Sequence, residues 1–536
     1  MAALLSSSPS PAATLYTRAT NNDFPKANFN FSKSISTSQR SHFGRISQSR
    51  NKRFCSIAAQ GGGGVLVDTA SEKSSPPLYS WPDNQKPRIC ILGGGFGGLY
   101  TALRLESLVW SDDKKPQVLL IDQSDRFVFK PMLYELLSGE VDAWEIAPRF
   151  SELLANTSVQ FVQDRVKTVT PSDHLGRNGT TKLISGGKVH LQSGICIEYD
   201  WLVLALGAEP RLDLVPGAAE FALPFSTLDD ARKVNNKLKS LERAKFGKDP
   251  SPIRVAVVGC GYSGVELAAT VSERLQSKGK VQAINVATTI LPGAPLGNRD
   301  AAMKVLSSRN VQLFLGYFVS SIKKTDKFED LKQLVGTETE KDGGFTLELK
   351  PAERGLEAKI LEADLILWTV GSKPLVPEVG DQPFQFPING RGQAETDDTL
   401  RVKGHPRVFA IGDSAALRDS SGRILPATAQ VAFQQADFAG WNLWAAINDR
   451  PLLPFRFQNL GEMMSLGRND AAITPSFIDG LTLDGPIGHT ARKIAYLIRL
   501  PTDEHRVKVG VSWLAKSAVD SIASFQSTVT KVLSGS

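Results

Sequence analysis

The sequence is poor in cysteine, and the few cysteines it has lie far apart. They are Cys55, Cys90, Cys196 and Cys260, and none of them forms a C-x-x-C pair. This spacing excludes a zinc ribbon, a C-x-x-C dithiol centre and the disulfide framework of a small secreted protein. The six histidines are scattered and form no ligand cluster, so the sequence predicts no metal site.

Long apolar runs are also absent. No stretch reaches 18 uninterrupted apolar residues, so no membrane-spanning helix is predicted. At 536 residues, with 41% hydrophobic and 22% charged residues, the chain has the composition of a globular protein with two or three domains.

Acidic residues are almost missing from the first 60 residues, where Asp23 is the single acid beside eight Lys and Arg. The remaining chain holds 54 basic and 54 acidic residues, so the net charge of +7 comes from this leader alone. A neutral body gives no reason to expect nucleic acid as a partner.

The leader is rich in serine as well as basic, which is typical of an organellar transit peptide. We therefore expect a transit peptide over 1–60 and a flexible linker over 61–84. The chloroplast is the favoured destination, with the mitochondrion or dual targeting as the alternative. A basic arm that stays on the protein is the other interpretation.

A glycine-rich turn follows an apolar strand in the stretch RICILGGGFGGLYTALRLES, residues 88–107. Gly93 permits the tight turn, Gly95 lets the backbone approach a pyrophosphate, and Gly98 lets the following helix pack on the strand. The next apolar run, QVLLID, ends in Asp122, and an acid at the end of a second strand suits ribose hydroxyls. This stretch predicts a dinucleotide site.

Three later stretches resemble motifs of the glutathione-reductase-like flavoproteins, in the order of that superfamily. They are LVLALGAEPR (202–211), ADLILWTVGSKP (363–374) and HPRVFAIGDSAAL (405–417). The resemblance implies that the first turn binds FAD and that Gly412 and Asp413 hold its ribityl or pyrophosphate region. It also places Gly207 and Gly371 in cofactor-binding turns.

A second turn, GCGYSG, stands between IRVAVV and VELAATV and carries Gly259, Gly261 and Gly264. In the same superfamily a nicotinamide domain interrupts the flavin domain, which explains why one chain needs two phosphate-binding turns. We therefore expect an α/β fold with two doubly wound dinucleotide-binding domains. The expected flavin domain covers 85–249 and 375–440, and the NAD(P)H-binding domain covers 250–374.

The end of the second strand in the nicotinamide domain bears on the choice of donor. A carboxylate there binds the 2′-hydroxyl of NADH and repels the 2′-phosphate of NADPH. Asn285 occupies this position, so NADPH is favoured over NADH as the donor. Lys278 and Lys280 are candidates to meet the 2′-phosphate, but a solvated loop is their favoured interpretation.

Residues 123–142, QSDRFVFKPMLYELLSGEVD, contain no cysteine where disulfide reductases of this architecture carry a pair. Thiol–disulfide chemistry is thereby excluded, and a sulfide:quinone oxidoreductase is disfavoured. The stretch instead resembles the F-x-F-x-P-L-L-Y-E-x-x-x-G run of type II NAD(P)H:quinone oxidoreductases. Further stretches with this likeness are 215–234, 261–271 and 426–440.

The likeness spans residues 86–515, and together with the leader it resembles the plastid-directed C-type branch of the plant alternative NAD(P)H dehydrogenases. It departs from the family pattern at Asn285 and in a long polar insertion at 325–344. The resemblance implies transfer of two electrons from NAD(P)H through FAD to plastoquinone or another membrane prenylquinone, without proton pumping.

The family resemblance implies three catalytic residues. Glu266, in GVELA, is placed near the flavin and the quinone, although an acid early in a helix can simply favour the helix dipole. Gln430 and Gln434 lie one helical turn apart and so share a face. The resemblance places their amides at the quinone head group, and amides that only bridge protein groups are the alternative.

The segment 489–525 carries apolar and aromatic residues among basic ones. This pattern fits a helix lying in a membrane interface, and we expect membrane association over 441–536. A homodimer interface or a helix folded onto the core also fits.

Two other functions remain open from the sequence. One is a pyridine-nucleotide flavoprotein reductase with a soluble acceptor, and the other is an apoptosis-inducing-factor-like flavoprotein with a mainly binding role.

Overall fold

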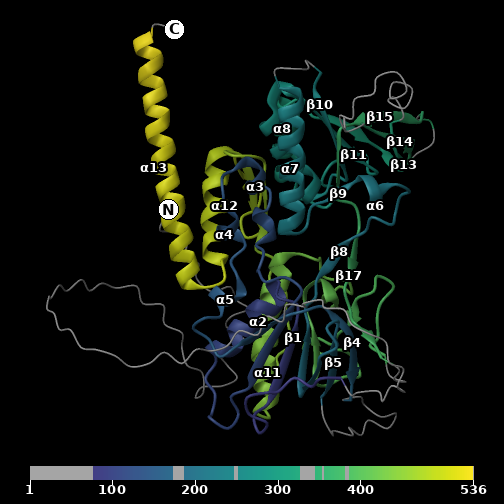
Figure 1. Cartoon of the computed structure of the whole chain (residues 1–536), viewed down its shortest axis with the longest axis vertical. Coiled ribbons are helices and arrows are strands. Elements are labelled where there is room, and N and C mark those ends of the chain that lie inside the picture. Colours follow the sequence, from purple (N-terminus) through teal and green to yellow (C-terminus); the bar gives the residue numbers. More distant parts are fainter. Residues whose placement is uncertain are drawn as a thin grey trace, which may run out of the picture. The chain divides into compact units, whose positions relative to one another are not determined.

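The computed structural model describes residues 76–172, 186–246, 251–325, 344–352, 355, 357–380 and 385–534, with side chains as far as 518 (Figure 1). The leader expected at 1–60 and almost all of the insertion expected at 325–344 lie outside these residues. The described end of the linker expected at 61–84 packs against the fold. There Trp81 is 5% exposed and donates its Nε1 to the backbone oxygen of Glu198 at 2.8 Å.

A five-stranded parallel sheet forms the centre of the first domain, in the order β20-β7-β1-β2-β3. Its strands are β1 (Arg88–Leu92), β2 (Gln117–Asp122), β3 (Gln160–Gln163), β7 (Trp201–Leu204) and β20 (Val408–Ala410). The central strand β1 is covered on both faces, which is why its last four residues are all apolar. β20 comes from the returning chain, some 200 residues after β7.

Helices cover one face of this sheet and a small antiparallel sheet covers the other. The helices α2 (Phe96–Ser107) and α11 (Ala429–Ile447) pack on each other and against Ile89 and Ile91 of β1. The opposite side chains of β1, Cys90 and Leu92, face the antiparallel sheet. In this sheet β4 (Val166–Pro171), β5 (Gly187–Leu191) and β6 (Cys196–Tyr199) pair antiparallel, and the short strand β18 (Glu378–Val379) pairs parallel with β4.

The second domain repeats the plan with its own parallel sheet, in the order β12-β11-β10-β16-β9. Its strands are β9 (Leu223–Pro224), β10 (Ile253–Val258), β11 (Gly279–Asn285), β12 (Gln312–Leu315) and β16 (Leu365–Trp368). The helices of this domain are α7 (Leu228–Lys245), α8 (Tyr262–Leu275) and α9 (Leu296–Ser308). An antiparallel sheet packs against the parallel one and consists of β13 (Tyr317–Lys324), β14 (Phe345–Pro351) and β15 (Lys359–Ala363).

The two domains are joined by two chain crossings that pair with each other. The outgoing strand β8 (Ala208–Pro210) pairs antiparallel with the returning strand β17 (Ser372–Pro374). Each crossing starts at a glycine in the left-handed region, Gly207 at φ 75° and Gly371 at φ 76°. The second domain is therefore inserted into the first at a two-stranded ribbon.

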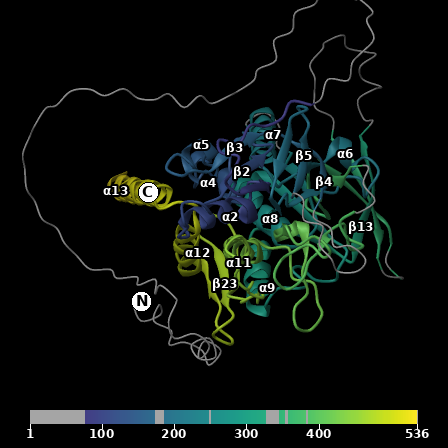
Figure 2. The ribbon, with the colours of Figure 1, turned by 90° about the horizontal axis from the view of Figure 1, so that it is seen from below.

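The C-terminal part forms a three-stranded antiparallel sheet followed by two helices. The strands are β22 (Gly461–Ser465), β23 (Ala471–Pro475) and β24 (Leu483–Asp484), and the helices are α12 (Gly485–Arg499) and α13 (Asp503–Ser534). Helix α12 lies on this sheet, and Figure 2 shows α13 beside α12 at the edge of the molecule. Among the described residues, none of the helices combines the length and the apolarity needed to cross a bilayer.

Short elements complete the fold. They are η2 (Lys130–Met132), α3 (Glu135–Ser138), α4 (Ala143–Ile146), α5 (Phe150–Leu153), α6 (Ala218–Phe221), η3 (Gln276–Lys278), β19 (Ala394–Glu395), η4 (Gly412–Ser414) and β21 (Ala415–Ala416).

Candidate functional site

The first glycine-rich turn connects β1 to α2 and leaves room for a ligand at its centre. Gly93 has φ 99°, a conformation that favours glycine. A Cβ on Gly98 would lie 1.8 Å from the backbone oxygen of Gly93, so only glycine allows this contact between helix and turn. A Cβ on Gly95 would meet nothing within 4 Å. Gly95 therefore faces open space at the N-terminus of α2, where an anion is stabilised by backbone N–H groups.

The second turn, between β10 and α8, has the same geometry. Gly259 has φ 101°, and a Cβ on Gly264 would again lie 1.8 Å from the oxygen of the first glycine. Gly261, the counterpart of Gly95, also faces open space. The two domains thus offer two equivalent sites for a dinucleotide phosphate.

The strand ends beside the two turns differ in one functional group. Asp122, at the end of β2, accepts from Gly94 N at 2.6 Å and from Ser124 N at 2.7 Å. Asn285, at the end of β11, accepts from Cys260 N at 3.3 Å and donates its amide to Thr289 O at 2.7 Å. A carboxylate braces the first turn and an uncharged amide braces the second.

The returning chain brings a second acid to the first turn. Asp413 follows β20, and among the described residues no group donates a hydrogen bond to its carboxylate. Burial raises the pKa of both Asp122 and Asp413, and the charge of Lys130 opposes both shifts. Two acids that are 291 residues apart in the sequence therefore lie around one cation.

Two residues that the sequence reasoning missed help to build this site. Lys130 stands in the FKPMLYE stretch that carries the family likeness. That likeness is the signal in the sequence that could have marked Lys130 as a residue of the flavin site. Gln435 is 1% exposed and accepts from Gly412 N at 2.7 Å, which fixes the turn before Asp413. Helical spacing singles out its neighbour Gln434 together with Gln430. Gln435 lies on a different face of α11 and contacts the turn at Gly412.

Glu266 lies on the first turns of α8 and is buried. Its Oε1 accepts from Ser465 N at 2.9 Å, and its side chain hydrogen-bonds to Tyr134. Burial raises the pKa of Glu266 to about 7, although the bond from Ser465 and the charge of Arg492 oppose the shift. A carboxyl with this pKa exchanges protons near neutral pH.

Arg492, on α12, is the charged neighbour of Glu266 and is fully buried. Its Nη2 contacts Glu135 Oε1 at 2.5 Å, and Lys493 lies 3.8 Å from the other oxygen of Glu135. The ion pair compensates for burying the charge of Arg492. The end of the chain therefore contributes a buried cation beside Glu266, which the amphipathic pattern of 489–525 did not predict.

Gln430 and Gln434 share a face of α11, and both contact the chain just before β22. Gln430 donates to Gly461 O at 3.1 Å and accepts from Leu460 N at 3.1 Å. Gln434 donates to Gln458 O at 2.8 Å and accepts from Gln458 N at 2.9 Å. These bonds use one N–H of each amide, so a contact between the second N–H and a quinone oxygen stays a prediction.

The comparisons with known proteins agree with this geometry. The family model described as pyridine nucleotide-disulphide oxidoreductase matches residues 87–436. The chain is 68% identical, over 471 residues and 88% of each protein, to the alternative NAD(P)H-ubiquinone oxidoreductase C1, chloroplastic/mitochondrial, of Arabidopsis thaliana. It is 41% identical to the demethylphylloquinone reductase NdbB of Synechocystis, over 81% of this chain and 97% of that protein.

The chain belongs to the type II NAD(P)H:quinone oxidoreductases, within the pyridine nucleotide-disulphide oxidoreductase family. The resemblance seen in the sequence is confirmed. The fold is confirmed as well, because the structure of NDH2 from Plasmodium falciparum in complex with NADH matches with a TM-score of 0.64. That match has 18% identity and covers 80% of this chain and 98% of the other.

The first turn of this type II oxidoreductase fits FAD, the flavin of its family. Gly95 leaves the space that a pyrophosphate needs, and the carboxylate of Asp413 is available to accept from a ribityl hydroxyl. The contact of Asp122 with the ribose hydroxyls stays a prediction. Bound there, FAD would supply the capacity to accept a hydride and release two electrons.

Lys278 and Lys280 are exposed, in line with the solvated interpretation. Lys278 is the last residue of η3 and Lys280 is the second residue of β11, and Lys278 Nζ rests over the ring of Phe246 at 4.0 Å. Asn285 is at the other end of the strand, and strands rise about 3.3 Å per residue, so the lysines lie roughly 16–23 Å along the chain from Asn285. Nearness in sequence does not bring them to the donor.

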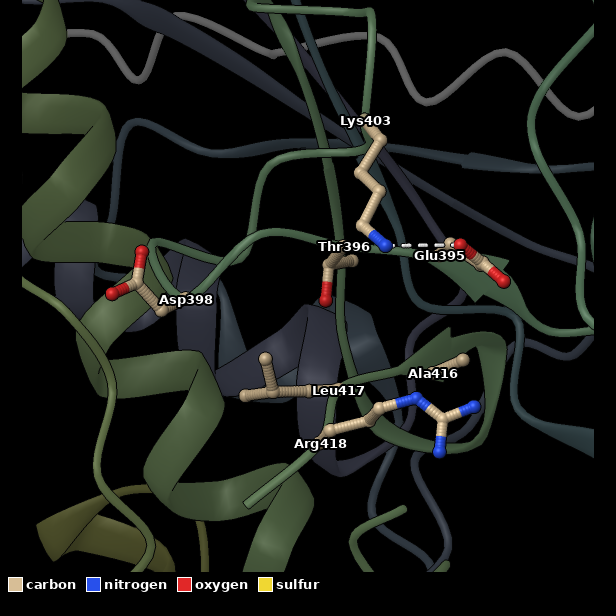
Figure 3. Close-up of a pocket in the computed structure, with 7 residues that line it drawn as sticks. All are labelled: Glu395, Thr396, Asp398, Lys403, Ala416, Leu417 and Arg418. Carbon is tan, nitrogen blue, oxygen red and sulfur yellow. Dashed lines mark hydrogen bonds and ion pairs between the residues drawn. The ribbon is translucent and has the colours of Figure 1, made fainter. Parts of the chain in front are cut away.

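A surface pocket lies between residues 395–403 and residues 416–418, which end β21 and follow it. Figure 3 shows Lys403 reaching Glu395, with which it forms an ion pair at 3.0 Å. The other lining residues are Thr396, Asp398, Ala416, Leu417 and Arg418. Its charges are mixed and none of the catalytic candidates lines it, so we assign it no part in electron transfer.

Proposed function

We propose that this chain is an FAD-dependent oxidoreductase that transfers two electrons from NAD(P)H to a membrane prenylquinone. The observation that carries the proposal is the pair of equivalent phosphate turns in two domains, with Glu266 on the helix that starts at the second turn. A quinone accepts a hydride equivalent and one proton to become a quinol. The chain must therefore bind the donor, orient it toward the flavin and supply the proton on the acceptor side.

Glu266 is the proposed proton donor. It is buried near Tyr134, its pKa is raised to about 7, and it lies one helical turn from the nicotinamide turn. The protonated form is therefore well populated at neutral pH, when a quinone oxygen gains electrons and becomes basic. Gln430 and Gln434 are the proposed uncharged hydrogen-bond donors to the quinone carbonyls. Each would use the side-chain N–H that is not bonded to a backbone oxygen.

We propose that NADPH is at least as good an electron donor as NADH. Asn285 uses its amide within the turn and carries no charge, so it does not repel a 2′-phosphate. Plastoquinone or another prenylquinone of the chloroplast is the proposed acceptor. The leader and the chloroplastic and mitochondrial name of the Arabidopsis relative support a chloroplast location, with dual targeting as the alternative.

Membrane association through α12 and α13 is part of the proposal. Each helix exposes an apolar row at helical spacing, and these side chains are 51–74% exposed. The rows are Ile487, Ile494 and Ile498 on α12, and Val507, Val511 and Leu514 on α13. A row of this kind beside basic side chains suits the interface of a bilayer, from which a prenylquinone must be taken. Pairing of two copies through these rows is the alternative use.

The test of the reaction is a steady-state assay of the purified protein with NADPH or NADH against a panel of acceptors. The panel contains short-chain prenylquinones, a plant-type ferredoxin and monodehydroascorbate. We expect rapid turnover with the quinones. Turnover with a soluble carrier alone, or slow turnover with every acceptor, would reject the proposal.

The test of membrane association is flotation with liposomes. Removing 489–536 would strip buried Arg492 and Tyr496 from the core, so substitution of exposed residues is the cleaner experiment. Ile494→Glu with Ile498→Glu should cut binding at least tenfold, because burying each apolar side chain is worth about 1.5–3 kcal/mol. If the protein forms a concentration-dependent dimer and does not bind liposomes, the apolar rows would instead be a homodimer interface.

A further inference from the structure

Residues 458–465, which we call the strap, are held by all three proposed catalytic side chains. Gln434 and Gln430 bind its first half from α11, on the flavin side of the molecule. Glu266 binds the last residue of the strap from α8. One short segment therefore contacts every residue assigned to the acceptor side.

The strap is also bonded to the nicotinamide turn. Tyr262 is the first residue of α8, directly after Gly261, and its hydroxyl donates to the carboxylate of Glu462. The backbone oxygen of Glu462 accepts from Asn298 Nδ2 at 3.3 Å, so the residue is anchored on both sides. Tyr262 and Glu266 lie four residues apart on α8 and meet the strap at its middle and its end.

The bond between Tyr262 and Glu462 lies where a donor brings negative charge. Gly261 faces the open space that suits a pyrophosphate, and Tyr262 is its neighbour. Burial raises the pKa of Tyr262, and the charge of Glu462 raises it further, so the hydroxyl stays protonated and keeps donating. A pyrophosphate at this turn repels the carboxylate of Glu462 and favours release of the strap from α8.

Given the proposed function, we propose that the strap couples the two substrate sites, and that Glu462 is the positioning residue through which a bound donor alters the quinone side. The strap has two arrangements, one bonded to Tyr262 and one released from it. Because Gln430 and Gln434 hold the same backbone, its release changes how their amides are presented. Binding of donor and acceptor is then linked, and linkage acts equally in both directions.

Equilibrium binding to the oxidised, flavin-loaded protein tests this coupling without turnover. The probes are NADP⁺ and a water-soluble short-chain quinone, which do not react with each other. The NADP⁺ dissociation constant is measured with and without saturating quinone. In the wild type we expect the two constants to differ by about fivefold or more, the lower end of common coupling factors.

The variants are Glu462→Gln, which removes the charge that a pyrophosphate repels but keeps an acceptor for Tyr262, and Tyr262→Phe, which removes the bond. Both keep the size of the side chain. Both should reduce the coupling factor to less than about twofold. Asp479→Asn is the matched control, because it removes an exposed carboxylate from the same C-terminal sheet region and should keep the wild-type factor. The visible flavin spectrum and the melting temperature establish that each variant is folded.

A wild type without coupling, or variants that retain its coupling factor, would overturn the proposal. These outcomes are distinct from failure of the proposed function. A wild type that reduces quinones with neither NADPH nor NADH rejects the function, whereas normal quinone reduction with unchanged coupling in both variants rejects the strap alone.

Discussion

The two glycine-rich turns have nearly the same backbone and differ in the group that braces them. Their first glycines have φ values of 99° and 101°, and a Cβ on the third glycine would clash at 1.8 Å in both. The brace is Asp122 in the first turn and Asn285 in the second. The shared geometry suits a dinucleotide phosphate in both domains, and we propose that the brace determines which charges each site tolerates.

The two turns also differ in the residues that surround them. The first is closed by the returning chain, which adds Asp413 and the buried Gln435. The second is bordered by Tyr262, whose hydroxyl reaches Glu462 in the C-terminal sheet. A tightly enclosed turn suits a cofactor that stays, and a turn whose neighbour can be released suits a donor that comes and goes.

The largest expected effect is loss of ligand binding when each turn is blocked by a substitution, one turn at a time. Gly95→Glu places a carboxylate in the phosphate position, and the protein should lose bound flavin, with affinity reduced at least a hundredfold, or about 2.7 kcal/mol. Gly261→Glu should keep the flavin and weaken NADP⁺ binding to a similar extent. Flavin content and the NADP⁺ dissociation constant are the measurements. A yellow Gly95→Glu protein would show that the first turn is not the flavin site.

The next effect concerns Glu266. Glu266→Gln should slow the acceptor half-reaction on the order of a hundredfold, the usual size for general acid catalysis, and leave flavin reduction by NADPH almost unchanged. In the wild type the acceptor rate should fall as pH rises through about 7, because the protonated carboxyl is the donor. A stopped-flow pH series measures both, and the same pH dependence in the Gln variant would contradict this role.

The stability of the protein offers an independent check on Glu266. Its folded pKa of about 7 lies above an unfolded value of roughly 4.3, so the fold binds this proton more tightly. The contribution to stability is complete below the unfolded pKa and is lost as pH rises through about 7. The free energy of unfolding should therefore fall between pH 5 and pH 8, and it should fall less in Glu266→Gln.

A smaller effect, on the preference between NADPH and NADH, is expected when Asn285 is replaced by the acid found at the same place in the first turn. Asn285→Asp keeps the acceptor for Cys260 N and introduces a charge, so NADPH should lose about tenfold in kcat/KM relative to NADH, or about 1.4 kcal/mol. The ratio of the two kcat/KM values is the measurement. Wild-type preference for NADH, or no shift in the variant, would place the determinant of donor choice elsewhere.

The smallest effect belongs to the glutamines. Gln434→Ala removes two hydrogen bonds to the backbone of Gln458, each worth about 1 kcal/mol, and should slow quinone reduction several-fold. Flavin reduction by NADPH should stay within twofold of the wild type. Slower flavin reduction in this variant would put Gln434 on the donor side.

The cofactor turns could be predicted from the sequence because their determinants are local. A strand, three glycines and a helix follow one another within about 20 residues, and the acid or amide at the next strand end is found by counting. The shared face of Gln430 and Gln434 is equally local, since it depends on helical periodicity alone. Their backbone partners, some 25–30 residues further on, follow from chain packing and not from spacing.

Contacts between distant segments could not be predicted in this way. Lys278 and Lys280 are close to Asn285 in sequence, but an extended strand separates them in space. The amphipathic pattern of 489–525 leaves open a membrane interface, a dimer interface and packing on the core, and it does not predict that Arg492 is fully buried against Glu135, a residue some 350 positions earlier. Periodicity identifies which residues share a face, and the fold of distant segments decides what covers that face.

Anaerobic sequential mixing of the wild-type protein tests the central claim most directly, which is that electrons enter at the second turn and leave to a quinone. In the first step NADPH should bleach the flavin absorbance. In the second, a short-chain prenylquinone should restore the colour in a rapid single phase, and buffer should not. Colour that returns no faster with quinone than with buffer would contradict the account.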